Sequence, residues 1–445
     1  MWTVAQLSRE LESGRTTSRE LVEAALARIA APDGEGKRAF MKVYADEARA
    51  AADYSDRLRK AGARRSPIDG LPVSLKDLFD VAGDVTRAGS KVYEKKAERD
   101  APAVARLRAA GAVFVGRTNM VEFAFGGVGL NPHYGTPRNP WDRNSGRVPG
   151  GSTSGGAVAQ ADGMCVMALG SDTRGSIRGP SSLCGVTGWK PTASRVPREG
   201  AFPLSYTLDT IGPLANSVAC CAAFDAVLAD VPLGPLPNLQ TKGLRLVVPR
   251  SSALDDLDPA VEKAFAAALS RFSRDGAIVE EKPVPAFDRQ AEYFKGGGYA
   301  GAESYYIHRH SLERLDEYDP RVGKRILLAK DFSAADYLAL GDLRRSFMRE
   351  IEALAAPYDA IVMPTTACTA PTIAETEASL DDYVRWNMRI LRNPGLINFL
   401  DGCAASVPCH EPGTAPVGLM VCGTAHTDRQ TLAVAAALER ALRAH

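Results

Sequence analysis

Two short segments rich in glycine and serine hold the residue types best suited to chemistry. The first is PGGSTSGGAVA at residues 149–159, and the second is GSDTRGSIRGP at residues 170–180. Small apolar residues continue directly from the first segment into a predicted helix, which argues against a flexible linker. Glycines that open a helix expose backbone N–H groups at the positive end of its dipole. The sequence therefore predicts a place where negative charge is stabilised.

The negative charge at this place belongs either to a phosphate or to an oxyanion. The phosphate-binding pattern GxxxxGK[ST] is absent, and no lysine follows the glycines. In the second segment an apolar run ends in a tight turn at residues 173–176, where consecutive N–H groups could converge on one oxygen. Ser176 stands at the end of this turn, where a nucleophile would lie. A serine nucleophile needs a base that accepts its proton.

Lys76 is the candidate base. None of the six histidines lies in either segment, although the fold could still bring one in. Lys76 ends an alternating stretch at 70–76 that predicts a strand, and it is the only lysine between Arg65 and Lys91. A lysine acts as a base only if burial lowers its pKa toward neutrality. The alternative is an ordinary exposed lysine.

The overall composition gives no sign of nucleic-acid or membrane binding. The 445 residues include 54 basic and 53 acidic side chains, a formal net charge of +1, and no basic block. The N-terminus lacks the basic and apolar regions of a signal peptide, and no apolar stretch is long enough to span a bilayer. We therefore expect a soluble, cytoplasmic protein that acts on a small molecule.

The cysteines predict buried free thiols in a reducing compartment. They are scattered, several lie within apolar runs, and no CxxC spacing suits zinc. They are Cys165, Cys184, Cys220, Cys221, Cys368, Cys403, Cys409 and Cys422. The histidines at 308 and 310 form a pair that does not by itself indicate a metal, so no metal site is expected.

The helices and strands that could position these residues are predicted from the periodicity of apolar residues and from residues that begin or end helices. A capping box at 17–20 opens an amphipathic helix, and residues 46–60 predict another. The acidic cap and proline at 100–102 predict a helix to about 110, followed by a strand at 112–116. Because helix and strand alternate in this way, we expect a mostly parallel sheet.

The remaining pattern extends this architecture to the whole chain. Glycine, proline and asparagine dominate residues 126–156, and an irregular segment of that length inside a domain is usually functional. Further strands are expected at 244–249, 277–280, 361–364 and 417–421, and further helices at 259–272 and 427–443. We predict one α/β domain over residues 1–445, with a central, mostly parallel twisted sheet flanked by helices.

Four segments together resemble the amidase signature family. They are GLPVSLKD at 70–77, GGS at 150–152, GSIR at 175–178 and GVTGWKPT at 185–192, with weaker similarity at 398–400 and 416–419. The resemblance implies the fold of that family, a catalytic core at about 70–192, and hydrolysis of carboxamides through a Ser–cis-Ser–Lys triad. It implies no metal or organic cofactor.

The resemblance also assigns roles to the triad. Ser176 would be the nucleophile that attacks the amide carbonyl. Ser152, in a cis peptide after Gly151, would relay its proton to neutral Lys76. The amine would leave with a proton returned through Ser152, and water would then hydrolyse the acyl-enzyme.

Neighbouring residues would support this triad. Ser171 would brace it, and Asp172 and Arg178 would hold the loop rather than take part in chemistry. The oxyanion would be held by the backbone N–H groups of Thr173, Arg174 and Gly175.

Two positions depart from the family's usual pattern. Thr153 stands where glycine or serine is typical, and Arg174 stands where glycine or alanine is usual. Arg174 either pairs with a nearby carboxylate and stabilises the loop, or binds an anionic group of the substrate. The second interpretation favours carboxybiuret-type or malonamate-type amides as substrates. The sequence leaves both interpretations of Arg174 open.

Two other functions compete with a stand-alone amidohydrolase acting on a small amide. One is the glutaminase (A) component of a glutamyl-tRNA amidotransferase, but residues 200–209 match that subfamily only loosely and Thr210 replaces its glutamine. The other is a non-catalytic scaffold, which the complete triad disfavours. Residues 290–400, rich in tyrosine, are expected to form a substrate-side cover. The sequence does not indicate the oligomeric state, and it leaves a homodimer as an open alternative.

Overall fold

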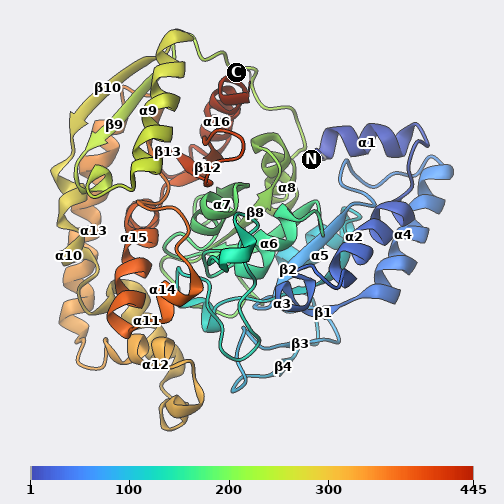
Figure 1. The fold of residues 1–445 in the computed structure, drawn as a ribbon, viewed down its shortest axis with the longest axis horizontal. Helices are drawn as coiled ribbons and strands as arrows, with labels where there is room; N and C mark the ends of the chain where they lie inside the picture. Colours follow the sequence, from blue (N-terminus) through green and yellow to red (C-terminus); the bar gives the residue numbers. More distant parts are fainter. Residues whose placement is uncertain (1–2, 444–445) are drawn as a thin grey trace.

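An eleven-stranded sheet forms the centre of the computed structural model, which describes residues 3–443 (Figure 1). The strand order is β1-β5-β2-β6-β8-β7-β12-β13-β11-β9-β10. The strands are β1 (Phe40–Val43), β2 (Pro72–Lys76), β5 (Val113–Thr118), β6 (Met167–Asp172), β7 (Thr187–Lys190), β8 (Thr210–Ala215), β9 (Arg245–Arg250), β10 (Ile278–Pro283), β11 (Ala360–Pro364), β12 (Cys403–Pro408) and β13 (Gly418–Gly423). A separate two-stranded ladder joins β3 (Val85–Thr86) to β4 (Lys95–Lys96).

The pairing is mixed, with parallel strands in two blocks. In one block β2 lies between β5 and β6, and in the other β9 lies between β10 and β11. The strands between these blocks pair antiparallel, including the β12–β13 hairpin. A hairpin needs no crossover helix, so the middle of the sheet departs from the α-then-β pattern of the N-terminal part. The expected α/β fold with a central sheet flanked by helices is confirmed, but the sheet is mixed rather than mostly parallel, because six of its strand pairs within residues 3–443 are antiparallel and four are parallel.

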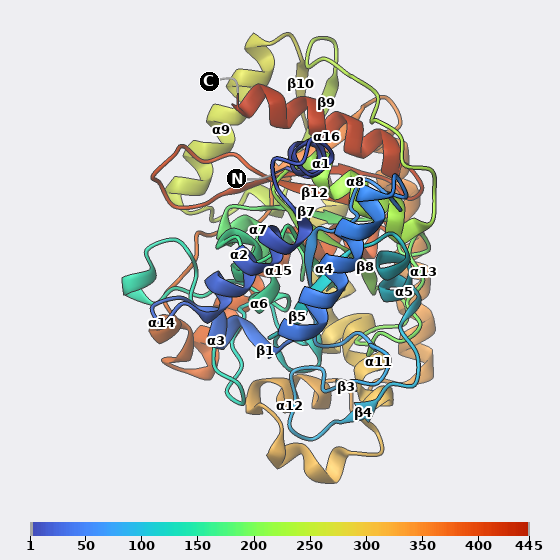
Figure 2. The same cartoon turned by 90° about the vertical axis from the view of Figure 1, so that its right-hand side faces the viewer.

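Helices cover the sheet on both faces. They are α1 (Val4–Glu12), α2 (Ser18–Ala30), α3 (Gly36–Ala39), α4 (Ala45–Lys60), α5 (Pro102–Ala109), α6 (Ser154–Ala161), α7 (Arg178–Cys184), α8 (Val218–Ala229), α9 (Pro259–Arg274), α10 (Gln290–Tyr293), α11 (Gly298–His308), α12 (Pro320–Leu327), α13 (Ala334–Ala355), α14 (Ile373–Glu377), α15 (Leu380–Phe399) and α16 (Asp428–Arg443). Helices α2 and α4 lie side by side, as Figure 2 shows.

Alternate residues of the central strands enter different parts of the core. Met167 and Leu169 of β6 pack in a cluster that includes residues of α5, α8 and α16. Ala168 between them packs in a second cluster with residues of α2, α4 and α6. Side chains of a strand alternate between its two faces, so both faces of β6 are covered. This explains why every residue of β2 and β6 is buried.

Several predicted elements appear with small shifts of their ends. The capping box at Thr17 and Glu20 is present and opens α2. The long irregular segment at 126–156 contains only a short 3₁₀ turn before α6 begins at Ser154. The acidic cap expected for α5 was wrong: its N-cap is Ala101, and the Asp100 side chain instead accepts hydrogen bonds from the Ala82 N–H and from Arg108.

Two further expectations from the sequence concern free, buried cysteines and the lack of a membrane-spanning segment. All eight cysteines are buried and unpaired, as expected. Among the helices of residues 3–443, none combines the length and the apolar character needed to cross a membrane.

The parallel block at β2 and β6 brings the candidate residues to one edge of the sheet. Lys76 is the last residue of β2, and Ser171 and Asp172 are the last two of β6. Because the two strands run in the same direction, their carboxyl ends meet, which is where open α/β sheets commonly carry their sites.

Candidate active site

A cis peptide bond joins Gly151 to Ser152. The segment lies just before α6, and Ser152 is fully buried. Gly151 has no room for a side chain, since an added Cβ would lie 2.8 Å from the Gly129 nitrogen and from a methyl group of Val121. The backbone of the irregular segment therefore closes tightly around this serine.

Lys76 contacts two serines from the end of β2. Its Nζ lies 2.8 Å from Ser152 Oγ and 2.9 Å from Ser171 Oγ, and the side chain is fully buried. Burial lowers the pKa of Lys76 to about 7, although the carboxylates of Asp172 and Asp209 oppose this shift. The ordinary exposed lysine is thereby excluded, and the side chain can gain or lose a proton near neutral pH.

Ser176 lies in the turn between β6 and α7, beside the cis segment. It is nearly buried, and its carbonyl oxygen accepts a hydrogen bond of 3.3 Å from the Thr153 N–H. Within residues 3–443 its hydroxyl makes no hydrogen bond. The structure thus brings Lys76, Ser152 and Ser171 into direct contact, and joins Ser176 to this group through the backbone.

Asp172 and Arg178 hold the turn that carries Ser176, as expected. The Asp172 carboxylate accepts hydrogen bonds from the N–H groups of Gly175 (2.8 Å) and Ile177 (3.1 Å), and Arg178 Nη2 lies 2.9 Å from it. Asn398 of α15 donates to the same carboxylate at 2.9 Å. Burial alone would raise the pKa of Asp172, but the Arg178 guanidinium holds it well below its usual range.

The three backbone N–H groups expected to hold an oxyanion differ in their surroundings. The Gly175 N–H already donates to Asp172. Those of Thr173 and Arg174 donate to no acceptor in residues 3–443. The Thr173 hydroxyl donates to Asp209 Oδ1 at 2.5 Å, and burial raises the pKa of Asp209 to about 6. Two N–H groups of the turn are therefore available to a bound oxygen.

Arg174 makes no ion pair with any carboxylate of residues 3–443. Its guanidinium carbon lies 3.6 Å from the centre of the Phe294 ring, and its buried Nε and Nη2 atoms have no hydrogen-bond partner. The side chain is 8 % exposed. Burial and the nearby charge of Arg325 lower the pKa of Arg174 to about 9. A stabilising pair with a carboxylate, one of the two interpretations from the sequence, is therefore wrong.

Sequence reasoning missed two residues of the predicted cover that reach the site. Arg325 of α12 donates to the Phe125 carbonyl at 3.3 Å and to Asn387 Oδ1 at 3.2 Å. Asn387 of α15 also accepts the Gly127 N–H at 2.8 Å. Both lie far along the chain from the loop that they contact, and no local motif marks them.

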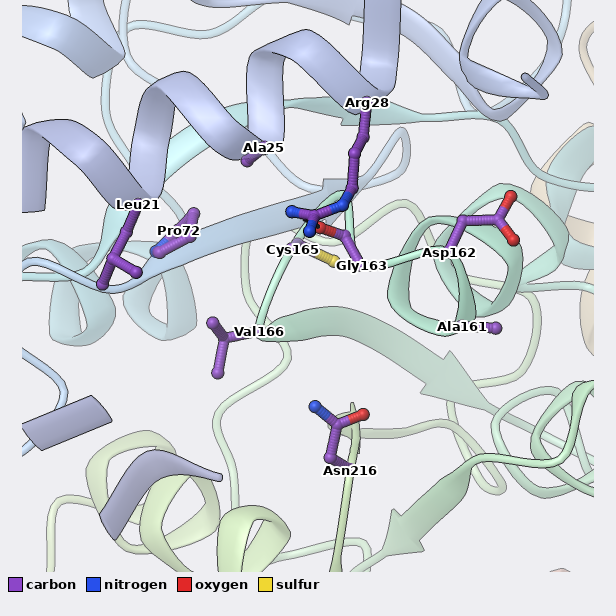
Figure 3. Close-up of a pocket in the computed structure, with 10 residues that line it drawn as sticks. All are labelled: Leu21, Ala25, Arg28, Pro72, Ala161, Asp162, Gly163, Cys165, Val166 and Asn216. Carbon is purple, nitrogen blue, oxygen red and sulfur yellow. Dashed lines mark hydrogen bonds between the residues drawn. The ribbon is translucent and has the colours of Figure 1, made fainter. Parts of the chain in front are cut away.

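Two cavities lie near the ends of β2 and β6. One of about 580 Å³ reaches Ser171 and Asp209, and the segment 193–211 forms most of its wall. The other, of about 280 Å³, lies between α2 and the residues that precede β6, and Pro72, Cys165 and Val166 line it (Figure 3). Because Pro72 is the first residue of β2 and Lys76 the last, the second cavity lies at the opposite end of the strands from the candidate site.

Comparisons with known proteins agree with this geometry. The family model described as Amidase matches residues 20–432. The chain is 35% identical to 2-amino-5-chloromuconic acid deaminase of Comamonas testosteroni, over 98% of this chain and 96% of that protein. It is 38% identical to the AtzE subunit of 1-carboxybiuret hydrolase of Pseudomonas sp. (strain ADP), over 82% of this chain and 81% of that protein.

Two further likenesses extend the comparison. The A component of glutamyl-tRNA(Gln) amidotransferase of Anaeromyxobacter dehalogenans (strain 2CP-C) is 36% identical, over 96% of this chain and 93% of that protein. A crystal structure of an amidase superposes with a TM-score of 0.89 at 32% identity, over 99% of both chains. The chain therefore belongs to the Amidase family, and it is an amidase, a hydrolase of carbon–nitrogen amide bonds.

Proposed function

We propose that this amidase hydrolyses a small carboxamide that carries a carboxylate, with Ser176, Ser152 and Lys76 as its triad. The observation that carries the proposal is the buried guanidinium of Arg174, which lies two residues from Ser176 and has no carboxylate partner within residues 3–443. A buried charge without a partner is costly, and a bound anion removes that cost.

The proton transfers follow from the contacts of Lys76. Lys76 Nζ donates to Ser152 Oγ and Ser171 Oγ, and with a pKa of about 7 it can lose a proton, after which its lone pair can accept the proton of Ser152. Ser152 in turn takes the proton of Ser176 as the Ser176 oxygen attacks the amide carbonyl. The N–H groups of Thr173 and Arg174 stabilise the oxyanion, joined by that of Gly175 if Asp172 releases it.

The second half of the reaction runs the same relay in reverse. Lys76 returns the proton through Ser152 to the leaving nitrogen, and ammonia or an amine departs. The acyl group remains on Ser176 as an ester. A water molecule then attacks this ester, with its proton taken along the same path, and the free acid is released.

The substrate's carboxylate would lie between Arg174 and Arg325. The charge of Arg325 contributes to the lowered pKa of Arg174, and neither guanidinium pairs with a carboxylate of residues 3–443. A planar guanidinium binds a carboxylate through two parallel hydrogen bonds. The names of two relatives, 2-amino-5-chloromuconic acid deaminase and 1-carboxybiuret hydrolase, also describe molecules that carry carboxylates.

Ammonia release from paired amides tests the proposal. The panel combines acidic amides, such as malonamate and succinamate, with neutral near-isosteres, such as acetoacetamide and 4-oxopentanamide. We expect at least tenfold higher kcat/KM for the acidic member of a pair, since a charged hydrogen bond contributes about 1.5–3 kcal/mol. All activity should vanish in Ser176→Ala. An equal rate for both members would refute the proposed substrate class.

The glutaminase component of an amidotransferase remains the second candidate, because a relative with that role is 36% identical over nearly the whole chain. In that role the protein would hydrolyse glutamine efficiently only with its partner proteins. Thr210, at the position of that subfamily's glutamine, donates its hydroxyl to the Asp172 carbonyl at 2.9 Å. Glutaminase activity that appears only with co-purified partner proteins would favour this candidate.

The proposal also covers the location, the parts of the domain, the oligomeric state and the distinction between an enzyme and a scaffold. Buried free thiols suit a reducing compartment, so we place the protein in the cytoplasm, acting on a small molecule without nucleic acid. Residues 70–192 form the catalytic core of one domain, and residues 290–400 its substrate-side cover.

Light scattering of the purified chain distinguishes a monomer from a homodimer. Labelling of Ser176 by a serine-directed acylating probe distinguishes an enzyme from a scaffold.

A further inference from the structure

Helix α12 is attached to the catalytic core near both of its ends. Its N-cap residue Asp319 donates its backbone N–H to Glu122 Oε2 at 2.6 Å. Near its C-terminal end, Arg325 donates to the Phe125 carbonyl at 3.3 Å. Glu122 and Phe125 lie in residues 121–127, a loop at the start of the long segment between β5 and α6, so this loop contacts α12 near both of its ends.

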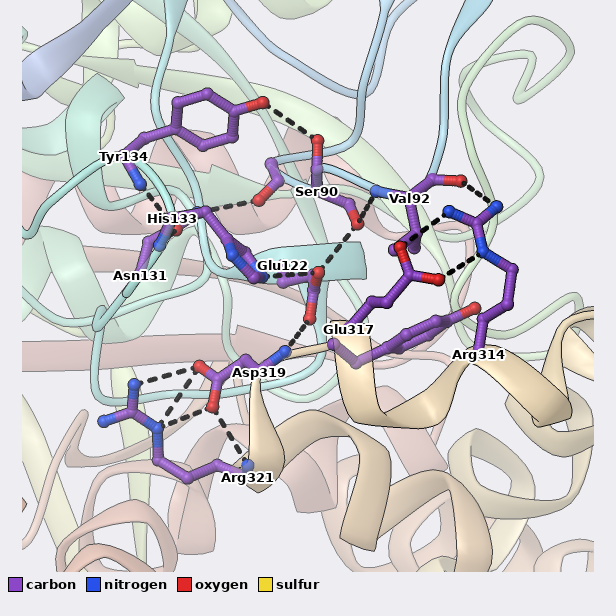
Figure 4. A network of polar contacts seen from close by, with 12 residues as sticks. Ser90, Val92, Glu122, Asn131, His133, Tyr134, Arg314, Glu317, Asp319 and Arg321 are labelled. Carbon is purple, nitrogen blue, oxygen red and sulfur yellow. Dashed lines mark hydrogen bonds and ion pairs between the residues drawn. The ribbon is translucent and has the colours of Figure 1, made fainter.

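Glu122 is held on the core side before it meets α12. Its side chain is fully buried, and Oε1 accepts a hydrogen bond of 2.7 Å from Ser90 Oγ (Figure 4). His133 Nε2 lies 2.9 Å from the same oxygen. A carboxylate with partners at both oxygens is firmly placed, and the N-terminus of a helix is a favourable neighbour for its charge.

The same loop also contacts the cis serine segment. The Val121 N–H donates to the Ser152 carbonyl at 3.1 Å, and the Gly151 N–H donates to the Gly127 carbonyl at 2.7 Å. Within the loop, Phe123 and Ala124 have φ angles of 50° and 59°. Residues other than glycine keep such angles only where their surroundings enforce them. The loop therefore connects the cis serine segment to α12 through hydrogen bonds on both sides.

We propose that Glu122 is a positioning residue, which fixes α12 so that the Arg325 guanidinium is held where it can bind the substrate's carboxylate together with Arg174. The inference rests on the proposed function, since it assigns to Arg325 a part in anion binding. Glu122 makes no hydrogen bond or ion pair with Lys76, Ser152 or Ser176 within residues 3–443, so we assign it no part in the proton transfers. Its effect should appear in the affinity for acidic substrates.

Glu122→Gln tests this role, and Glu317→Gln is its matched control. Glu317 belongs to the same cover but pairs with Arg314 on the surface, where the two side chains are 49% and 45% exposed. With succinamate we expect Glu122→Gln to raise KM about tenfold, the loss of one good charged contact. Its kcat, and both constants for 4-oxopentanamide, should stay within about twofold of the wild type. Glu317→Gln should change none of these constants.

A double-mutant cycle shows whether Glu122 acts through Arg325. Arg325→Ala should raise KM for succinamate by itself, and adding Glu122→Gln should raise it little further, because the residue that Glu122 positions is gone. Additive effects would contradict the proposal. Binding of succinamate to Ser176→Ala, measured by calorimetry with and without Glu122→Gln, gives the same comparison without turnover.

Other outcomes separate this inference from the proposed function. If the wild type shows no preference for the acidic amide, the proposed substrate class fails and the positioning role fails with it. If the wild type prefers the acidic amide and Glu122→Gln keeps that preference, only the positioning role is overturned. An equal loss on acidic and neutral amides would mean a merely structural role.

Ser90→Ala provides a second variant in case Glu122→Gln does not fold. It removes one hydrogen bond to Glu122 and leaves all charges in place. We expect a rise in KM for succinamate of about threefold, with normal labelling of Ser176 by an acylating probe, because a neutral hydrogen bond contributes less than a charged one. An unchanged KM in this variant would also count against the role of Glu122.

Discussion

Lys76 is the residue whose protonation state should limit the rate. Only its neutral amine can accept a proton from Ser152, and its pKa is lowered to about 7. As the pH falls below 7 the amine becomes protonated, so kcat/KM should fall about tenfold per pH unit, and above 7 it should level off. A pH–rate profile for a neutral amide checks this, because such a substrate does not itself titrate.

Lys190 is a matched control for that profile. It is also buried, and burial lowers its pKa to about 8, but its amine donates to the Pro191 carbonyl rather than to a serine. Lys190→Met should therefore keep the fall in kcat/KM below pH 7, whereas Lys76→Met should abolish activity. A shift of this fall to another pH in Lys190→Met, or activity retained in Lys76→Met, would contradict the assignment.

Arg174 and Arg178 should respond to substitution in opposite ways. Arg174→Met removes a buried charge that lacks a carboxylate partner, so we expect the free energy of unfolding to rise by about 1 kcal/mol while KM for acidic amides also rises. Arg178→Met leaves the Asp172 charge unpaired and should cost about 3–5 kcal/mol. Urea denaturation of the two variants measures both effects. Destabilisation by Arg174→Met would mean that the guanidinium is stabilised without substrate.

At the scale of elements, the turn between β6 and α7 depends on Gly175. Its φ is +121°, and an added Cβ would lie 2.6 Å from Pro394 of α15. Gly175→Ala should therefore displace either the Ser176 turn or α15, with a loss of about 2 kcal/mol in stability and at least tenfold in kcat. Thermal unfolding and ammonia release measure the two effects.

Gly146→Ala separates the effect of crowding from that of backbone angle. Gly146 also has a positive φ, of +64°, but nothing lies within 4 Å of an added Cβ. The substitution should cost only about 1 kcal/mol from the backbone and leave kcat unchanged. A similar loss of kcat in both variants would show that crowding against α15 is not the cause.

The elements of the N-terminal half could be predicted from the sequence because their signals are local. The capping box of α2 and the alternating residues that end at Lys76 specify their own structures. The mixed pairing in the middle of the sheet could not be predicted, since the pairing partners of β7 and β12 are set by packing between distant segments. Local propensity carries no such information.

At the scale of the whole molecule, the candidate site combines residues that the sequence predicts with residues that only the fold brings to the site. Lys76, Ser152 and Ser176 lie in long motifs, and the structure brings their segments together. Arg325 and Asn387 carry no motif, because an arginine or an asparagine on a helix is common and only the packing of α12 and α15 brings them to the loop. The environment of Arg174 likewise depends on Phe294, which lies 120 residues further along the chain.

Ligand binding should therefore stabilise the whole molecule in a way that depends on charge. Succinate, which resembles the acidic part of the proposed substrate, binds between the core and the cover in this scheme and should raise the unfolding temperature. At a concentration of 100 times its Kd the gain is about 2.7 kcal/mol. Differential scanning calorimetry of Ser176→Ala with succinate, compared with sodium chloride at equal ionic strength, measures it.

The same experiment locates the site that succinate occupies. In Arg174→Met and in Arg325→Ala the stabilisation by succinate should be lost or strongly reduced, because each variant removes one of the two cations that would receive its carboxylate. Arg314→Met, on the exposed surface of the cover, should keep it. Stabilisation of equal size in all three variants would place succinate elsewhere, and the buried guanidinium of Arg174 would then need another ligand to explain its lack of a carboxylate partner.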